Sequence, residues 1–223
     1  MCTLTKENNN ILETLISIFT IDKGELKVLL SRKKNDPFKG YWTLPGNFLK
    51  NTETIEENIE NVILNNTGLN NVYIEQCFTF SNLNRNIEDR IIATTFIGLI
   101  DSKSVEMKND LIKTNEFELF SIDEVPKMGY DHEEVITKNI EFLKKKIINS
   151  NVLKSLFPSD FTLPELQRVY EQILGKELDR RNFRKKFISL DLIEDTNEKN
   201  IGCNGRPAKL YRFKDEIKEI NLF

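Results

Sequence analysis

The stretch that decides the fold of this chain is Trp42-Thr43-Leu44-Pro45-Gly46-Asn47-Phe48-Leu49, and Thr67-Gly68-Leu69 completes it further along. Between these segments, apolar residues recur with the 3.6-residue period of a helix, at Ile55, Ile59, Val62 and Ile63. Thr54 followed three residues later by Glu57 is the pattern of a capping box, and Gly68 is the residue type that commonly ends a helix. The sequence therefore predicts a turn-rich loop that leads into a helix from Ile55 to Thr67.

This loop and helix resemble the Nudix box, G-x5-E-x7-R-E-U-x-E-E-x-G-U, in which U is a bulky aliphatic residue. Gly68 and Leu69 set the register, and Glu53 then falls on the first glutamate. Where the pattern has R-E-U-x-E-E, the chain reads Asn61-Val62-Ile63-Leu64-Asn65-Asn66. The aliphatic residue is kept, but the arginine and the three carboxylates are lost. Asn47 also stands where the family usually has a second glycine.

The lost carboxylates remove the chemistry that the box would perform. Cleavage of a diphosphate needs Mg²⁺ or Mn²⁺ to neutralise the phosphates and to activate water. These cations require oxygen ligands, mainly carboxylates, which Val62, Asn65 and Asn66 do not supply. The other acids of the predicted helix are Glu56, Glu57 and Glu60, which suit its first turn or point to other faces. The sequence predicts no catalytic residue, no metal and no cofactor, and a domain that binds rather than hydrolyses.

Composition fits a soluble protein of one large or two modest domains. The chain has 223 residues, with 32 basic against 35 acidic side chains. No apolar run reaches the ~18 residues that span a bilayer, and the start of the chain lacks a signal-peptide profile, so we expect a cytoplasmic protein with no membrane partner. The three cysteines are scattered, which favours neither a zinc site nor disulfides. His132 is expected to be a first-turn helix residue rather than a ligand.

Further segments predict strands around the first helix, at residues 15–21, 26–32, 72–80, 90–100 and 117–122. Asp131-His132-Glu133-Glu134 fits the capping box of a second helix that runs to about Ile148. This order of elements matches an α/β/α Nudix sandwich. A polar segment, Asn149-Ser150-Asn151, then marks a boundary, so we predict one domain over residues 1–149 and a second over residues 150–223.

The second domain differs in charge and in pattern. Residues 151–223 carry 14 basic and 12 acidic side chains, and six of the basic ones lie between Lys176 and Lys186. Phe161-Thr162-Leu163-Pro164-Glu165-Leu166 predicts a capped helix that ends at Gly175. Asp179 is a predicted N-cap for a second helix to Leu190, and the tight turn between the two predicts a helix-turn-helix. Such a local basic cluster indicates an anionic partner.

The second of these helices has an apolar face at Phe183, Phe187 and Leu190 and a basic face opposite. Residues 192–195 and 209–213 can pair as a hairpin around a loop from Gly202 to Pro207, which predicts the wing of a winged helix, an α+β domain. Arg and Asn side chains near a helix N-terminus suit bases and phosphates in a major groove. The candidate DNA contacts are Arg180, Arg181, Asn182, Arg184, Lys185, Arg206 and Lys209. The alternative is a solvated basic face on a small domain.

The whole chain resembles the Nudix-related transcriptional regulators, a bacterial family with an N-terminal Nudix-like domain and a C-terminal winged helix. The resemblance is carried by residues 38–46, 130–132, 161–167, 178–186 and 205–213. It implies a homodimeric repressor that binds a palindromic DNA operator and responds to a small-molecule effector in the former Nudix cleft. Family members answer to ADP-ribose or to sugars. Because the bridging metal is expected to be absent, the sequence favours a sugar or phosphosugar over a diphosphate.

The effector is predicted to bind between the Pro37–Leu49 segment and the strand that begins at Arg90. Its candidate contacts are Trp42 and Phe48 as apolar walls, Glu53 as a hydroxyl acceptor and Arg90 as a polar contact. Trp42 is equally explained as a core residue. Two other functions stay open: an active Nudix hydrolase with an accessory nucleic-acid-binding domain, and a protein-interaction scaffold.

Overall fold

The N-terminal half is organised around β1 (Ile11–Asp22), which pairs antiparallel with β2 (Glu25–Arg32) and parallel with β6 (Ile91–Leu99). The computed structural model describes residues 10–69, 72–86, 89–101, 116–157, 160–200, 207–214 and 217–222. The sheet runs in the order β3-β2-β1-β6-β5, with β4 on β1 and β7 on β2. The added strands are β3 (Trp42–Thr43), β4 (Gly46–Phe48), β5 (Tyr73–Phe80) and β7 (Phe117–Ser121).

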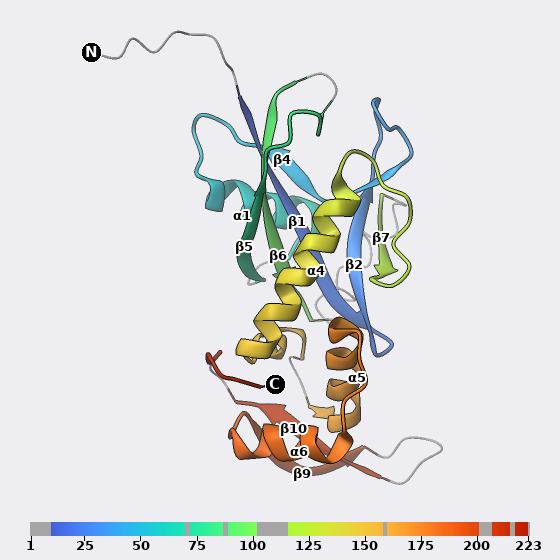
Figure 1. Cartoon of the computed structure of the whole chain (residues 1–223), viewed down its shortest axis with the longest axis vertical. Coiled ribbons are helices and arrows are strands. Elements are labelled where there is room, and N and C mark those ends of the chain that lie inside the picture. Colours follow the sequence, from blue (N-terminus) through green and yellow to red (C-terminus); the bar gives the residue numbers. More distant parts are fainter. Residues whose placement is uncertain are drawn as a thin grey trace, which may run out of the picture.

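Helices cover both faces of this sheet, as Figure 1 shows. Side chains along β1 alternate between the faces, so Leu15 and Phe19 join the core under one helix while Ile16 and Ile18 join the core under the other. α1 (Ile55–Thr67) buries Ile59, Val62 and Ile63 on the second face, and α4 (His132–Asn149) buries Val135, Ile136 and Leu143 on the first. The predicted α/β/α sandwich is confirmed.

The ends of α1 follow the local sequence. The Thr54 side chain accepts from the Glu57 N–H, and the Glu57 carboxylate accepts from the Thr54 N–H, which makes the predicted capping box. Gly68 closes the helix at φ 64°, a left-handed conformation that costs glycine little. β1 begins four residues before its predicted start, and the short strands β3 and β4 lie in what the sequence presented as a loop.

The capping box predicted for α4 is wrong. Asp131 is the N-cap residue of α4, but its side chain makes no capping hydrogen bond. Its carboxylate instead accepts two hydrogen bonds from the Arg85 guanidinium, at 3.0 Å each. A charge-assisted, two-point contact is stronger than a bond to a backbone N–H, so the distant arginine outcompetes the local cap.

The C-terminal half is the winged helix that the sequence predicts. Its elements are η1 (Val152–Leu156), β8 (Phe161–Thr162), α5 (Leu163–Leu174), α6 (Arg180–Ser189), β9 (Ile193–Asn200) and β10 (Ala208–Phe213), with the strands in the order β8-β10-β9. Thr162 and Glu165 form the predicted capping box, Gly175 closes α5 at φ 68°, and Asp179 caps α6. The rings of Phe183 and Phe187 pack edge-on against buried Tyr170, with centroids 5.6 and 5.4 Å away.

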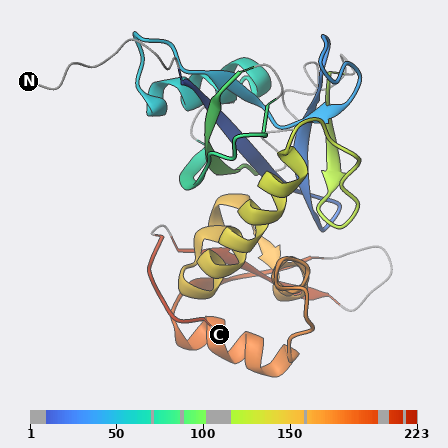
Figure 2. The ribbon, with the colours of Figure 1, turned by 45° about the horizontal axis from the view of Figure 1, so that its top comes forward.

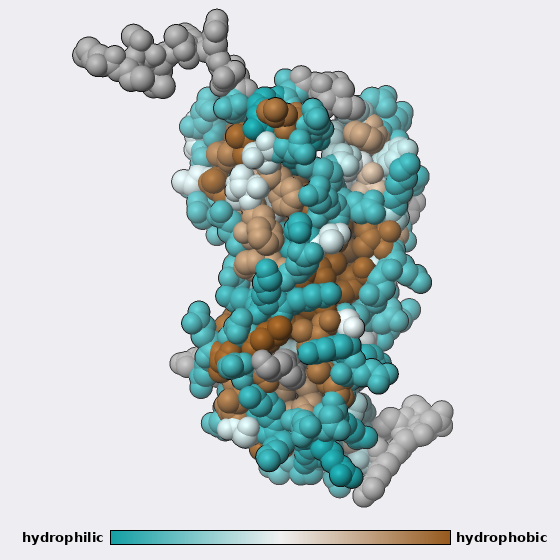
Figure 3. All heavy atoms as spheres, in the orientation of Figure 1, coloured by the Kyte–Doolittle hydropathy of each residue, from teal (hydrophilic) through white to brown (hydrophobic). Residues whose placement is uncertain are grey.

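The two halves share one apolar core at their junction. The cluster that contains Leu143 and Ile147 of α4 continues through Leu153 into Leu166 and Val169 of α5. Figure 2 shows α4 between the sheet and the winged helix, and Figure 3 shows hydrophobic side chains gathered across the waist where α4 and α5 meet. The described helices include none that is long and apolar enough to cross a membrane.

A polar contact also ties the halves together. The amide of Gln172 on α5 accepts from the Leu26 N–H at 2.5 Å and donates to the Leu26 carbonyl at 3.4 Å, as a neighbouring strand would. The same amide nitrogen donates to Asp123 at 3.0 Å. At the far end of α4, backbone N–H groups of Ile220 and Leu222 donate to the last helical carbonyls at 2.8 Å. These contacts fix the position of the winged helix relative to the sheet.

Candidate functional site

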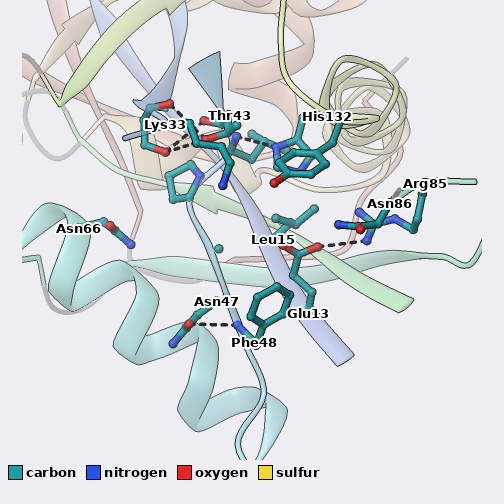
Figure 4. A pocket seen from close by; sticks show the side chains of 15 residues that line it. Glu13, Leu15, Lys33, Thr43, Asn47, Phe48, Asn66, Arg85, Asn86 and His132 are labelled. Carbon is teal, nitrogen blue, oxygen red and sulfur yellow. Dashed lines mark hydrogen bonds and ion pairs between the residues drawn. The ribbon is translucent and has the colours of Figure 1, made fainter. Parts of the chain in front are cut away.

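A cavity of about 300 Å³ opens at one end of the sandwich. Figure 4 shows its lining, which comes from β1, the end of β2, the segment from Thr43 to Phe48 that includes β4, α1, the segment before β6 and the start of α4. The polar side chains around it are Glu13, Ser31, Lys33, Thr43, Asn47, Asn66, Arg85, Asn86, Tyr130 and His132. The cavity therefore lies where the degenerate box meets the start of α4.

Arg85 is the centre of the charge network beside this cavity. Its side chain is 3% exposed, and all three of its guanidinium nitrogens are committed. Nε and one Nη bind the two oxygens of Asp131 at 3.0 Å, and the other Nη binds Glu13 at 3.1 Å. Burial raises the pKa of Glu13 above its ordinary value, and the adjacent guanidinium opposes that rise. Arg85 thus joins β1 to the beginning of α4.

His132 is the first residue of α4, as the sequence predicts, and it holds the box loop. Its Nδ1 accepts a hydrogen bond from the Leu44 N–H at 3.0 Å. Burial lowers the pKa of His132 to about 3, and the positive charges of Arg85 and Lys33 act in the same direction. The ring is therefore neutral at physiological pH, with its proton on Nε2.

The family's metal positions do not fit a divalent cation here. Val62 is 3% exposed and belongs to the apolar core, while Asn65 is exposed to solvent. Asn66 reaches the cavity wall, but its amide nitrogen donates to the Val62 carbonyl at 2.6 Å. Within the described ranges, no group of three or more His, Cys, Asp or Glu side chains could hold a metal ion. A neutral amide and an aliphatic side chain do not replace the charge of carboxylates.

Of the four predicted effector contacts, the structure places Phe48 in the cavity wall, and its side chain is 49% exposed. Trp42 lies elsewhere, against the predicted position. Its ring packs edge-on against Phe120 at 4.9 Å, beside the main core, and the Arg32 guanidinium lies 5.9 Å from its centre. The alternative explanation of Trp42 as a core residue therefore fits its surroundings.

Glu53 and Arg90 also lie outside the residues that line the cavity. The Glu53 carboxylate accepts from the Lys50 N–H and from the Asn58 amide, at 2.9 and 2.7 Å, and these bonds lower its pKa. Arg90 donates to the carbonyl of Ser81 at 2.8 Å. Both side chains hold loops beside the sheet. The structure instead brings Glu13, Lys33 and Arg85 to the cavity, and their sequence surroundings carry no pattern that marks them.

The basic face of α6 lies free of the protein core. Phe183 and Phe187 are 2% and 0% exposed, whereas the five predicted DNA contacts on this helix are exposed: Arg180, Arg181, Asn182, Arg184 and Lys185. Lys209 is an exposed residue on β10, where Asp195 accepts from its ammonium at 2.5 Å. A groove of about 390 Å³ separates α6 and the start of α5 from β10. Arg206 lies outside the described residues.

A Nudix-like sandwich with a polar cavity, joined to a winged helix with an exposed basic helix, defines a DNA-binding transcription regulator with a ligand-binding domain. A family model described as the NrtR DNA-binding winged helix domain matches residues 153–213. The "ADPR responsive transcriptional repressor NtrR" of Acinetobacter baylyi is 31% identical over 211 residues, which is 93% of this chain and 83% of that protein. The chain belongs to the NrtR family of Nudix-related transcriptional regulators.

Solved structures agree with this assignment. Shewanella oneidensis NrtR complexed with a 27mer DNA has a TM-score of 0.81 and 31% identity, covering 91% of this chain and 93% of that one. The Nudix domain of the same protein, complexed with ADP ribose, has a TM-score of 0.53 and 25% identity over 61% of this chain and 90% of that chain.

A sequence relative with an enzyme's name also matches part of the chain. An ADP-ribose pyrophosphatase of Methanocaldococcus jannaschii is 30% identical over 125 residues, 56% of this chain and 72% of the enzyme.

Proposed function

We propose that this protein is a repressor that binds a palindromic operator as a homodimer, and that ADP-ribose or a related phosphosugar in the cavity controls its affinity for DNA. The proposed effector domain is residues 1–149 and the proposed DNA-binding domain is residues 150–223, acting in the cytoplasm where the operator lies. The names of the relatives support ADP-ribose, a diphosphate, whereas the lost carboxylates had favoured a sugar. The observation that carries the proposal is that one helix, α4, contributes to the cavity and packs on the winged helix.

The path through α4 is short and continuous. Tyr130 and His132 line the cavity at the start of the helix. Asp131, which lies between these two residues in the sequence, is held by its ion pair with Arg85. The other end of α4 packs against η1 and α5 and hydrogen-bonds to the C-terminal segment. A helix transmits a displacement of one end to the other because its backbone is rigidly bonded. A ligand that repositions residues 130–132 therefore biases the placement of the winged helix.

Such a ligand regulates DNA binding only if it prefers one arrangement of the domains or protomers. A ligand that binds both arrangements equally shifts nothing, however tightly it binds. A tenfold change in operator affinity needs about 1.4 kcal/mol of differential binding. The shared core at the junction of α4 and α5 supports a discrete change, because packed interfaces repack between alternatives rather than deform continuously.

We also infer that the cavity does not hydrolyse its ligand. The positions that would hold the metal are a buried valine and two asparagines, so the charge that activates water is missing. The alternative, a working hydrolase, is favoured by the similarity to the archaeal pyrophosphatase. Incubation with ADP-ribose, NADH and nucleotide sugars in Mg²⁺ or Mn²⁺ distinguishes the two. Turnover above about 1 s⁻¹, within the ordinary enzyme range, would establish the hydrolase.

The test of the proposed function joins ligand binding to DNA binding. Thermal-shift screening of ADP-ribose, NAD, pentoses and sugar phosphates identifies ligands that stabilise the full chain. Operator affinity is then measured by fluorescence anisotropy with each stabilising ligand. We expect a change of tenfold or more with ADP-ribose. If the best stabilising ligand leaves operator affinity within twofold, effector control is refuted and the scaffold alternative gains.

A further inference from the structure

The charged side chains around the cavity differ in whether they form ion pairs. Arg85 is paired with both Asp131 and Glu13, a cluster in which the carboxylates outnumber the guanidinium by one, and His132 is neutral. Lys33, the residue that follows β2, also lines the cavity, and Figure 4 shows its side chain extending toward the open space. The ion pairs formed within the described ranges do not include Lys33, whereas its neighbour Lys34 is paired with Glu116 at 2.7 Å. Lys33 thus brings to the cavity a positive charge that forms no ion pair among the described residues, although it lies near enough to Glu13 to lower the pKa of that carboxyl group.

The position of Lys33 is fixed by its own backbone and by an aromatic ring. Its N–H donates to the Tyr41 carbonyl at 2.9 Å, and its carbonyl accepts from the Gly40 N–H at 2.8 Å. Its ammonium lies 5.4 Å from the centre of the Tyr130 ring, within the range of a cation–π contact. Such an arrangement holds the charge at the cavity before any ligand arrives, which lowers the ordering cost of binding an anion.

On the α1 side of the cavity, an amide replaces a carboxylate of the Nudix pattern. Asn47 and Asn66 line the same cavity, and Asn66 stands where the Nudix pattern has a carboxylate. A carboxylate at that position without a metal would oppose a phosphate, whereas an amide can donate to it. The negative charges of Glu13 and Asp131 face the guanidinium of Arg85. Among the described residues, the site therefore offers the ammonium of Lys33 and neutral amides beside the Arg85 ion-pair cluster.

We propose that Lys33 binds a phosphate group of the effector directly and supplies the positive charge that a divalent metal supplies to Nudix enzymes, so that this chain binds its ligand without metal. The inference rests on the proposed function, because it assumes that the cavity takes an anionic metabolite. It also explains how a site without metal ligands can accept a diphosphate. Lysine is a common phosphate ligand because its ammonium is a compact charge with three donors.

The experiment is calorimetric titration of the full chain with ADP-ribose, in EDTA and again in Mg²⁺. We expect equal affinity in the two buffers for the unsubstituted protein. Lys33→Gln should weaken binding at least tenfold, and Lys33→Arg should recover most of the loss. Lys34→Gln is the matched control, because it removes the adjacent charge outside the cavity and should leave affinity within twofold. Adenosine, which lacks phosphate, should bind the unsubstituted and Lys33→Gln proteins alike.

The outcomes separate the two proposals. The role of Lys33 is overturned if ADP-ribose binding needs Mg²⁺, or if Lys33→Gln leaves ADP-ribose affinity within twofold of the unsubstituted protein. Either result leaves the effector proposal intact. If the unsubstituted protein binds neither ADP-ribose nor inorganic diphosphate, both the effector and the Lys33 assignment are overturned. An equal loss of adenosine and ADP-ribose binding in the Lys33→Gln protein would show damage to the cavity rather than a phosphate contact, and would also overturn the assignment.

Discussion

Replacement of Arg85 by methionine removes a buried guanidinium from between two carboxylates and leaves a shorter, unbranched and uncharged side chain. The Arg85 side chain is 3% exposed, and the Glu13 and Asp131 side chains are 18% and 16% exposed. Removal of one partner from a buried ion pair costs about 3–5 kcal/mol, because the remaining charge is left without compensation. Both carboxylates keep some access to water, so we expect a loss near the lower end, about 3 kcal/mol.

For a chain of this length, about 1 kcal/mol corresponds to about 2–4 °C in Tm, so the Arg85→Met protein should melt about 6–12 °C lower. Urea unfolding gives the free energy directly, with the fluorescence of the single tryptophan, Trp42, as the probe. Trp42 packs on Phe120 beside the main core, so its emission reports on loss of that packing.

The stability loss of the Arg85→Met protein should depend on pH with a defined sign. Burial already raises the pKa of Glu13, and Arg85 opposes that rise, so its removal raises the pKa further. A carboxyl group whose folded-state pKa is raised contributes stability below its unfolded pKa, and this is lost as pH rises through the folded pKa. The loss should therefore be largest at about pH 7.5 and smaller at about pH 5, where Glu13 takes up a proton.

The matched control is Lys138→Met on the exposed face of α4. Lys138 pairs with Glu141 at 3.2 Å, with side chains 46% and 48% exposed. Exposed pairs of this kind contribute about 0–1 kcal/mol, so Lys138→Met should cost well under the Arg85 variant. A loss below about 1 kcal/mol for Arg85→Met, or one that is the same at both pH values, would refute the reasoning about the buried network.

Two further predictions concern the DNA-binding half. Arg181→Ala should cost about 1–3 kcal/mol of operator affinity if the side chain reads a base. Arg184→Ala should lower affinity for all DNA sequences and reduce the slope of log affinity against log salt concentration by about one. Unchanged gel-shift affinity in both variants would show that α6 is not the recognition helix. Gln172→Ala removes the amide contact with Leu26 that, together with the packing of α4 on α5, fixes the winged helix relative to the sheet. It should leave ADP-ribose affinity within twofold while reducing the effect of ADP-ribose on operator binding, and anisotropy titrations that show the full effect in this variant would contradict a role for the contact in this control.

Local sequence determined the ends of several helices, because each cap is made by residues three or four positions apart. Thr54, Thr162 and Asp179 accept the hydrogen bonds that the sequence predicts, and Gly68 and Gly175 adopt left-handed backbone at the predicted positions. Apolar periodicity also predicted the inward faces of α1 and α6, since a helix side chain's direction follows from its spacing alone. These features need no knowledge of distant segments.

Tertiary structure decided the outcome where a local and a distant partner compete. Asp131 has the sequence pattern of a helix cap, yet its carboxylate binds Arg85, whose position in the chain gives no hint of the contact. The strands β3 and β4 arise in the same way, because their residues read as loop and become strands only by pairing with β2 and β1. A local sequence pattern indicates which kinds of group a residue can bind, but it does not show which distant residue the fold places beside it.

The sequence by itself determined two features residue by residue: the loss of carboxylates from the box, which favours binding over hydrolysis, and the basic face of α6. Only the tertiary structure decided which side chains surround the cavity. Glu13 and Arg85 meet because β1 and β6 pair in parallel, which places the segment before β6 beside the start of β1. Lys33 reaches the same cavity because β2 pairs with β1 and ends at that edge of the sheet. Strand pairing joins residues that are distant along the chain, and no local pattern records which strands pair.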